Sequence, residues 1–393
     1  MKQHWTLFTL VIVFGLCCCA LDPPKEQPPS DTQATARCST NPGYTWDLPK
    51  GFPRPCVPID NPMTHEKVAL GRHLFYDKRL SGNQTQSCSS CHLQKLAFTD
   101  GKAISKGSTG DSTLRNSMSL HNIVYASTLT WANPLLTNLE MQINVPLFGT
   151  RPVELGMRGR EKELVQRLQD HSKYQELFKK AYPKAAESIT VHNMKLALAS
   201  FLRSLISGNS VYDQVVYQGK RELLSDSARR GMNLFRSERM ECFHCHGGFN
   251  FQDSIVYDGK AAERFFHNTA LYNIDGKGGY PSPNTGVYEV TEDPKDMGRF
   301  RVPTLRNVEV TGPYMHDGSI KTLSEVIDHY AAAGRTISSG PNKGIGKNNP
   351  NKSIFMVGFT ITDQEKADLI AFLKTLTDKK FLTDPKFSNP WKD

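Results

Sequence analysis

The sequence of 393 residues has few of the features that mark a membrane, nucleic-acid-binding or fibrous protein. Its only strongly apolar run, residues 7–21, is shorter than the roughly 20 residues that span a bilayer, which excludes a multi-span membrane protein. Lysine and arginine are scattered, so the net charge of +9 does not indicate nucleic-acid binding and instead favours acidic protein partners. Strand patterns are weak. With 38% hydrophobic residues, the chain has enough apolar material for about two or three folded domains, which excludes wholesale disorder and a collagen-like chain.

The amino-terminal end is typical of an export signal. A lysine precedes the apolar residues 7–16, and small residues follow, as in a secretory leader. Residues 17–19 are all cysteine, and the segment resembles a bacterial lipoprotein cleavage box in which Cys19 would carry the lipid; an ordinary leader cut nearby is the alternative. We therefore expect a periplasmic protein, free or membrane-anchored, with residues 1–19 as the signal peptide and 20–37 as a flexible tether.

Six cysteines follow the leader: Cys38, Cys56, Cys88, Cys91, Cys242 and Cys245. The first two lie in a stretch rich in proline and glycine. Because thiols oxidise in an exported chain, we expect a disulfide between Cys38 and Cys56. The other four cysteines belong to one chemical pattern.

That pattern is C-x-x-C-H, the attachment signature of c-type haem, and it occurs twice: Cys88, Cys91 and His92, then Cys242, Cys245 and His246. Two thiols at this spacing can each form a thioether to one porphyrin, while the adjacent histidine ligates the iron. The rival interpretation is one zinc site built from both cysteine pairs, but the pairs are far apart in sequence and each carries its own histidine. The motifs therefore predict two covalently bound haem c groups with His92 and His246 as proximal ligands.

The sequence around each motif is also repeated. The pattern G-x-x-L-F occurs at 71–75 and again at 231–235, before the first and second haem motif respectively. The repeat indicates two cytochrome c-like haem domains, which we place at 38–212 and 213–393. Because strand signals are weak, we expect a mostly α-helical fold with long loops.

A helix at 188–205 is predicted before the second domain, because apolar side chains recur at three- and four-residue steps. They are Val191, Met194, Leu198, Phe201, Leu202 and Leu205. Turn-forming residues at 207–210 and 217–219 then indicate a break in secondary structure. This break is the reason for a domain boundary near 210–222.

At this point the sequence resembles the di-haem cytochrome c peroxidase family, and within it the MauG-like branch. Four strings carry the resemblance: LFYDKRLS at 74–81, LRN at 114–116, GRFRVPTLRNV at 298–308 and TGPYMHDG at 311–318. The resemblance covers roughly residues 44–387. It implies a peroxidase-type oxidoreductase in which the N-terminal haem reacts with H₂O₂ and the C-terminal haem stores or relays oxidising equivalents, with a calcium ion and a tryptophan between them.

The resemblance assigns catalytic roles to four residues. Trp131 matches the tryptophan between the two haems, whereas a lone tryptophan would ordinarily be a core residue. Gln142, Pro146 and Glu154 match residues above the open face of the first haem. Glu154 would move a proton between the two oxygens of bound peroxide. Without the resemblance, Glu154 would be interpreted as a solvated surface residue.

One expected ligand is missing at the first haem. Peroxidases of this family usually hold a histidine in the loop after the first motif, and it caps the iron until the other haem is reduced. Residues 93–114 contain no histidine. The first haem is therefore expected to be five-coordinate and open, as in the MauG-like branch.

The second haem is expected to have a tyrosine ligand. Thr322 and Glu325 form a capping box, Gly334 closes the helix, and one apolar face carries Leu323, Val326, Ile327 and Tyr330. A buried tyrosine is usually a core aromatic. The position matches the site where the peroxidases place methionine and MauG-like enzymes tyrosine, so the resemblance implies Tyr330 as the distal ligand, with Tyr314 and Met315 as alternatives. A phenolate favours oxidised iron more than a thioether does.

The resemblance also implies a calcium site. Asn116, Thr311 and Pro313 match the family's ligands, the last two through backbone oxygens, and all are hard oxygen donors as Ca²⁺ requires. Hydrogen bonding within a loop is the alternative role for Asn116. His316 is expected near the haems without an assigned role.

The partner is less well defined than the cofactors. The namesake of the branch has a tryptophan two residues before its second haem motif, where this chain has Met240, and Trp46 and Trp391 have no evident place in such a path. We expect an enzyme that reacts with H₂O₂, forms a high-valent two-haem state and oxidises a residue of a partner protein. The alternative is a cytochrome c peroxidase that reduces H₂O₂ with electrons from a small redox protein. A plain electron carrier is a third hypothesis, which Glu154 and the missing second ligand to the first iron oppose.

Overall fold

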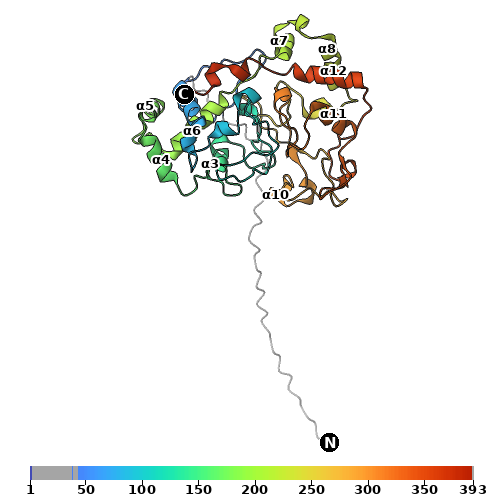
Figure 1. The fold of residues 1–393 in the computed structure, drawn as a ribbon, viewed down its shortest axis with the longest axis horizontal. Helices are drawn as coiled ribbons and strands as arrows, with labels where there is room; N and C mark the ends of the chain where they lie inside the picture. Colours follow the sequence, from blue (N-terminus) through green and yellow to red (C-terminus); the bar gives the residue numbers. More distant parts are fainter. Residues whose placement is uncertain (2–37, 39–42, 392–393) are drawn as a thin grey trace. The chain divides into compact units, whose positions relative to one another are not determined.

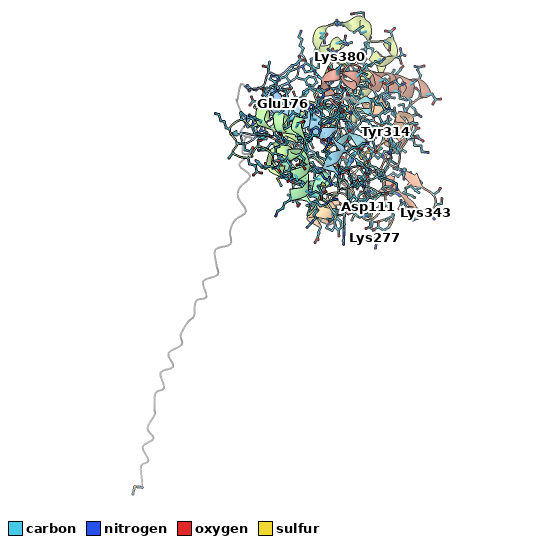
Figure 2. All side chains as sticks on the ribbon, turned by 60° about the vertical axis from the view of Figure 1, so that its left-hand side comes forward. Asp111, Glu176, Lys277, Tyr314, Lys343 and Lys380 are labelled. Carbon is cyan, nitrogen blue, oxygen red and sulfur yellow. A yellow bond between two sulfur atoms is a disulfide. The ribbon has the colours of Figure 1, made fainter. Side chains whose placement is uncertain are left out.

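The computed structural model describes Met1, Cys38 and residues 43–391, and the described residues from Cys38 onward belong to one compact unit (Figure 1). The predicted tether and nearly all of the predicted leader, including Cys19, lie outside the described residues. Among the described residues, no helix combines the length and apolar character needed to cross a membrane. Exposed charged side chains such as Glu176, Lys277 and Lys343 lie at the periphery of the unit (Figure 2).

Helices dominate the described residues. The α-helices are α1 (His65–Phe75), α2 (Leu139–Gln142), α3 (Asn144–Phe148), α4 (Glu161–Gln169), α5 (Ser172–Ala181), α6 (Val191–Arg203), α7 (Val211–Gln218), α8 (Asp226–Phe235), α9 (Cys242–Cys245), α10 (Tyr288–Thr291), α11 (Leu323–Ala331) and α12 (Asp363–Lys374). Short 3₁₀ helices are η1 (Lys78–Leu80), η2 (Cys88–Ser90), η3 (Gln94–Leu96), η4 (Ile123–Tyr125), η5 (Arg221–Leu223), η6 (Pro294–Asp296), η7 (Val308–Val310), η8 (Gly346–Asn348), η9 (Phe381–Thr383) and η10 (Pro385–Phe387).

The strands are two residues long each: β1 (Phe266–His267), β2 (Phe300–Arg301), β3 (Thr336–Ile337) and β4 (Gly344–Ile345). β1 pairs antiparallel with β2, and β3 with β4. The prediction of a mostly helical fold with long loops is therefore confirmed. Helices α4, α5 and α6 lie on one side of the unit, and α8, α11 and α12 lie on the other (Figure 1).

Two similar helix crossings explain the repeated glycine of the G-x-x-L-F pattern. α1 packs against α6, and α8 packs against α12. A Cβ atom on Gly71 would lie 2.0 Å from the carbonyl oxygen of Ala197, and one on Gly231 would lie 1.9 Å from that of Asp368. Only glycine allows two helix backbones to approach this closely. The repeat in the sequence therefore marks the same helix crossing in both halves of the unit.

Each crossing has its own buried core. In the first, Leu74 and Phe75 of α1 pack with Phe201 of α6. In the second, Phe235 of α8 packs with Phe372 of α12. Burying such side chains contributes about 1.5–3 kcal/mol each, and Cys88 and Cys242 of the two haem motifs pack against these cores.

Both predicted helices are present, although the one predicted at 188–205 spans only Val191–Arg203 and the second ends at Ala331, before Gly334. α6 is capped by Thr190 and buries Met194, Leu198, Phe201 and Leu202, which belong to the predicted stripe. α11 begins after Thr322, whose side chain forms the predicted capping box with Glu325. The predicted disulfide between Cys38 and Cys56 is present.

The expected break across 207–219 is wrong in its centre, where residues Val211–Gln218 form α7. Ser210 caps this helix, with Asp213 completing a capping box, and the chain leaves it at Gly219, which has a φ of +79°. The same serine and glycine that suggest a turn are therefore the start and stop signals of a short helix. Where the boundary between the two haem domains falls stays a prediction.

Candidate active site

The two C-x-x-C-H motifs line two separate cavities. The first cavity, of about 360 Å³, is lined by Cys88, Cys91 and His92. The second, of about 230 Å³, is lined by Cys242, Cys245 and His246. Among the described residues, no group of potential metal ligands brings the two cysteine pairs together. This separation opposes a shared zinc site and fits one haem c per cavity.

His92 is oriented by a backbone carbonyl. Its Nδ1 atom lies 2.7 Å from the carbonyl oxygen of Phe98, a buried residue with a φ of +64°. Burial lowers the pKa of His92, which favours the neutral ring. With Nδ1 as the hydrogen-bond donor, Nε2 carries the free electron pair that can bind a metal. An orienting hydrogen bond of this kind is typical of a histidine that ligates a metal.

His246 repeats this arrangement in the second cavity. Its Nδ1 atom lies 3.1 Å from the carbonyl oxygen of Phe251, which also has a positive φ, of +51°. Burial lowers the pKa of His246 as well. A left-handed phenylalanine after each motif is unusual enough to indicate that both carbonyls are held for the same purpose. Both histidines are therefore set up alike, as proximal ligands require.

A buried arginine tests whether the second cavity fits a haem. Arg301, in β2, lines this cavity and is 4% exposed. It donates to the carbonyl oxygen of Thr128 at 2.9 Å and contacts Sδ of Met118, but its Nε atom has no partner and no carboxylate pairs with it among the described residues. Burial lowers the pKa of Arg301 to about 10, so it stays charged. Because an unpaired buried cation is costly, the cavity fits a group with carboxylates, and haem carries two propionates.

Trp131 lies between the two cavities and lines both. Its Nε1 atom donates to the carbonyl oxygen of Asn116 at 2.8 Å, and its own carbonyl oxygen accepts from the backbone of Arg301 at 2.7 Å. Trp131 is therefore held by hydrogen bonds at its indole and at its backbone. Its position agrees with the role that the resemblance implies, and also contributes to core packing with Leu271 and Phe300.

The three other predicted catalytic residues line the first cavity together. Gln142 ends α2, Pro146 lies in α3, and Glu154 follows in the loop before α4. Burial raises the pKa of the Glu154 carboxyl group. The Oε1 atom of Gln142 is buried without a hydrogen-bond partner. The cavity therefore holds a shifted carboxyl group and an unsatisfied polar atom, a combination more common at reactive sites than in a packed core.

The predicted face of α11 lines the second cavity. Leu323, Val326, Ile327 and Tyr330 all contribute to its wall. Tyr330 lines this cavity together with Cys242 and Cys245, and burial, followed by these two cysteines, raises the pKa of its phenol. Its hydroxyl group has no hydrogen-bond partner among the described residues, so it is available to a ligand.

The two alternative ligands of the second iron also line this cavity. The hydroxyl group of Tyr314 already donates to the carbonyl oxygen of Val308 at 3.1 Å. Met315 has a φ of +71°, and its thioether carries no comparable hydrogen bond. Hydrogen bonding therefore favours Tyr330 over Tyr314 and does not separate Tyr330 from Met315.

The predicted calcium ligands Asn116, Thr311 and Pro313 line the same second cavity. Asn116 donates from Nδ2 to the carbonyl oxygen of Lys102 at 2.7 Å, which leaves its amide oxygen for another partner. His316 stacks on Phe300 at 3.7 Å, and burial lowers its pKa to about 4, so it is neutral. Its Nε2 atom has no partner.

Comparison with known proteins decides the family. The sequence model of the family described as di-haem cytochrome c peroxidase matches residues 65–222. The cytochrome-c peroxidase IdrP1 of Denitromonas iodatirespirans is 35% identical over 84% of this chain and 87% of its own length. This chain belongs to the di-haem cytochrome c peroxidase family. The methylamine utilization protein MauG of Methylophilus methylotrophus is 31% identical over 86% of this chain and 91% of its own length.

Solved structures agree with this membership. A crystal structure of a MauG-like protein associated with microbial copper homeostasis is 50% identical, covers 89% of this chain and 100% of that chain, and has a TM-score of 0.86. The di-haem peroxidase BthA of Burkholderia thailandensis, at 21% identity and a TM-score of 0.64, supports the fold alone. The predicted fold of two cytochrome c-like domains and the predicted peroxidase-type di-haem oxidoreductase are both confirmed. Family membership implies two haem c groups, H₂O₂ as a substrate and a protein as electron donor or substrate.

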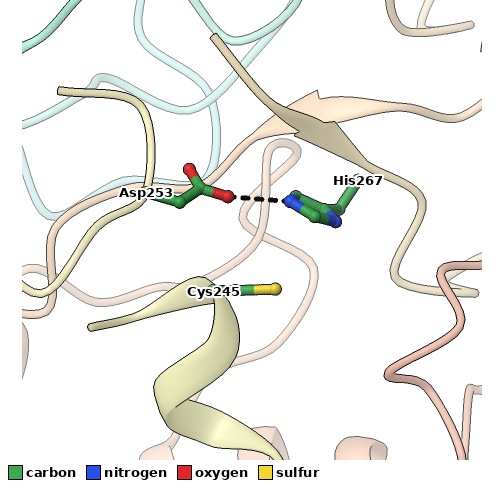
Figure 3. Close-up of side chains that lie close together, drawn as sticks. All are labelled: Cys245, Asp253 and His267. Atoms are coloured by element: carbon green, nitrogen blue, oxygen red, sulfur yellow. Dashed lines mark hydrogen bonds and ion pairs between the residues drawn. The ribbon is translucent and has the colours of Figure 1, made fainter. Parts of the chain in front are cut away.

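One cluster in this di-haem peroxidase escaped the sequence analysis. His267 in β1 lies 2.7 Å through Nε2 from Oδ2 of Asp253, beside Cys245 (Figure 3). Burial alone would lower the pKa of His267, but the hydrogen bond to Asp253 and the nearby thiol raise it to about 9. The three side chains could hold a metal by geometry, but Cys245 is a predicted haem attachment residue, and a thioether would take up its thiol. No sequence signal joins these residues, because the β1–β2 pairing brings His267 beside the second motif.

Proposed function

We propose that this chain is a periplasmic enzyme of the MauG-like branch that uses H₂O₂ to oxidise a residue of a partner protein. The observation that carries the proposal is an asymmetry between the cavities. The described residues that line the first cavity include His92, Glu154 and Gln142 but no second histidine, whereas the second cavity is lined by His246 and by Tyr330, whose hydroxyl bonds to no described residue. An open site and a closed site in one chain suit an enzyme better than an electron carrier.

The first cavity would bind and cleave peroxide. When bound, the two haem groups supply one-electron redox chemistry at iron. Glu154 would take a proton from one peroxide oxygen and deliver it to the leaving oxygen, which a carboxyl group with a raised pKa can do near neutral pH. Gln142 would orient the peroxide through its free Oε1 atom, and Pro146 would limit the space above the iron.

The second cavity would hold the haem that stores oxidising equivalents for the partner protein. Tyr330, through its phenol oxygen, and His246 would both hold the second haem iron. Trp131 would couple the two cavities, since it lines both and is fixed by hydrogen bonds at its indole and its backbone. A calcium ion would bind between the halves through Asn116, Thr311 and Pro313.

We propose that this chain works in the same cellular process as the 50% identical MauG-like protein, which is associated with microbial copper homeostasis. Its partner protein would then be associated with copper homeostasis as well. We also propose export through a leader at residues 1–19, with lipidation at Cys19 as the variant that would anchor the enzyme. The haem domains would then comprise residues 38–212 and 213–393.

The second candidate function is a peroxidase that reduces H₂O₂ with electrons from a small redox protein. Two observations favour it. Met315 lines the second cavity and could replace Tyr330 as the ligand. The relatives IdrP1 and the cytochrome c551 peroxidase of Pseudomonas aeruginosa, 27% identical over 68% of this chain, are peroxidases by name.

Titration of the diferric holoprotein with H₂O₂ separates the two functions. The MauG-like function predicts that one equivalent changes the absorption of the fully oxidised protein, and that the change persists until a protein substrate is added. The peroxidase function predicts no persistent change, and requires a reduced donor protein for turnover. A holoprotein whose absorption does not change on addition of H₂O₂, in the diferric or in the reduced form, would contradict both functions.

A further inference from the structure

A ring cluster at the edge of the first haem domain surrounds Trp391, which the proposed function does not use. The indole contacts three aromatic rings edge to face. The centroid distances are 5.1 Å to His73, 5.5 Å to His171 and 5.6 Å to Tyr174. Trp391 is half-buried, whereas Tyr174 is fully buried. The cluster therefore connects the interior to the surface.

Tyr174 links this cluster to the first haem motif. It belongs to the same buried core as Cys88, which carries one haem thioether. Burial and the neighbouring Asp77 raise the pKa of the Tyr174 phenol well above its usual value. Tyr174 therefore contacts Trp391 and belongs to the core against which Cys88 packs.

The hydrogen bond of Tyr174 suits electron loss. Its hydroxyl group donates to Oδ2 of Asp77 at 2.6 Å, and that carboxylate pairs with Arg79 at 2.9 Å. A phenol that loses an electron becomes a strong acid, and here the proton can pass directly to a carboxylate. Oxidation of Tyr174 thus gives a neutral radical and not a radical cation, and the single positive charge gained stays on Arg79, which is partly exposed.

Trp391 suits the outer end of such a path. Its Nε1 atom donates to the carbonyl oxygen of His73 at 3.1 Å, which holds the ring beside Tyr174. The guanidinium of Arg79 lies 5.7 Å from the centroid of the indole, and its positive charge would disfavour a second positive charge on the oxidised ring. The ion pair with Asp77 offsets the charge of Arg79. Because the indole is partly exposed, a small molecule can reach it.

We propose that Tyr174 and Trp391 form a second exit for the oxidising equivalents that peroxide delivers at the first haem, separate from the route through Trp131 to the partner. The activity at this exit is oxidation of small one-electron donors at the surface of Trp391. When no donor is present, Trp391 itself is oxidised. This exit rests on one part of the proposed function, namely that H₂O₂ reacts at the first haem.

The electron and proton balance is as follows for each transfer. Tyr174 gives one electron toward the haem and its phenolic proton to Asp77; Trp391 then returns an electron to Tyr174, and the proton moves back. A donor at the surface restores Trp391. Two such electrons, with two protons from solvent, reduce one H₂O₂ to two waters. Without a donor, Trp391 loses two electrons and two protons and gains one oxygen atom from water, so that one H₂O₂ yields an oxygenated tryptophan and one water.

The test is peptide mass spectrometry of the holoprotein after repeated additions of H₂O₂ without partner or donor. We expect oxygen addition at Trp391, suppressed by ferrocyanide as a one-electron donor. In Tyr174→Phe, which keeps the ring, oxidation of Trp391 should fall several-fold. Trp46 is the internal control, since it is also half-buried but packs with Phe52 and Tyr125 in a different cluster, and its oxidation should be low in both proteins.

A second variant protects the test against misfolding of Tyr174→Phe. Trp391→Phe should keep the absorption change with the first equivalent of H₂O₂ but lose haem absorbance several-fold faster on repeated additions, while Trp46→Phe should not. Equal oxidation of Trp391 in the wild type and Tyr174→Phe, or equal oxidation of Trp391 and Trp46, would overturn the exit. Loss of the initial absorption change in the wild type would instead overturn the proposed function, so the two failures are distinguishable.

Discussion

The indole of Trp131 donates to the carbonyl oxygen of Asn116 at 2.8 Å, and both residues line both haem cavities. Asn116 in turn contacts the other half of the unit, because its own backbone N–H donates to the carbonyl oxygen of His316 at 2.8 Å. The link between the cavities is therefore a short, fixed connection. Its rigidity is what an inter-haem relay would require.

Trp131→Phe tests the relay. The smaller ring keeps an apolar side chain in place but removes the Nε1 donor and the easily oxidised indole. Both haems should stay attached, and the first should still respond to H₂O₂, while oxidation of the second slows by roughly tenfold or more, or about 1.4 kcal/mol in activation free energy. Stopped-flow absorption at the two haems measures this. Equal rates in wild type and variant would show that Trp131 is only a packing residue.

Glu154→Gln tests proton transfer in the first cavity. Loss of general acid–base catalysis should slow the reaction with H₂O₂ by roughly 10²–10⁴-fold. Glu187→Gln, at an exposed position, is the matched control and should react at the wild-type rate. Unchanged kinetics in Glu154→Gln would remove this carboxyl group from the mechanism.

The pH dependence gives an independent check on Glu154. Burial raises its pKa above the ordinary value of 4.5, and the carboxylate is the form that accepts the first proton from peroxide. The rate should therefore fall as the pH drops through the raised pKa, so the midpoint of the acid limb lies above 4.5. That limb should be absent from Glu154→Gln. A midpoint at or below 4.5 would contradict the assignment.

Tyr330→Phe tests the ligand of the second iron. The variant removes one oxygen atom, and both haems should remain attached because the thioethers and His246 are unchanged. The peroxide-oxidised form of the protein should no longer persist. Tyr314→Phe is the matched control, since its hydroxyl group only donates to Val308, and it should behave like the wild type. Persistence in Tyr330→Phe would transfer the ligand role to Met315.

A buried ion pair predicts where stability is most sensitive. Arg306 and Asp213 are each 1% exposed and are joined by two hydrogen bonds of 2.9 Å. Asp213→Asn leaves a buried cation unpaired and should lower the free energy of unfolding by about 3–5 kcal/mol. Glu163→Gln removes the exposed carboxylate that pairs with Arg160 and Arg167, and should lower the free energy of unfolding far less. Chemical denaturation of the holoprotein measures both, and similar losses would refute the special role of the buried pair.

Local patterns predicted much of this molecule. The haem motifs, the stripe of α6 and the capping box of α11 depend on residues close in sequence, and each is found where expected. The pattern of α11 also predicted that Tyr330 shares a face with Leu323, and both line the second cavity.

What escaped prediction depends on contacts between distant segments. Arg301 and His267 reach the second cavity because β1 pairs with β2. Each strand is only two residues long, so the sequence carries no pattern that predicts the pairing. The left-handed Phe98 and Phe251 have no signature, because the fold imposes on them a conformation that phenylalanine disfavours. The helix α7 was mistaken for a break because serine and glycine mark helix ends as well as turns.

The central claim is that the first iron has an open coordination position and the second does not. Electron paramagnetic resonance of the diferric holoprotein measures the coordination of both irons at once. We predict one high-spin signal, from the iron bound by His92 alone, and one low-spin signal, from the iron held between His246 and Tyr330. Two low-spin signals would contradict the account, because a fully ligated first haem has no place for peroxide.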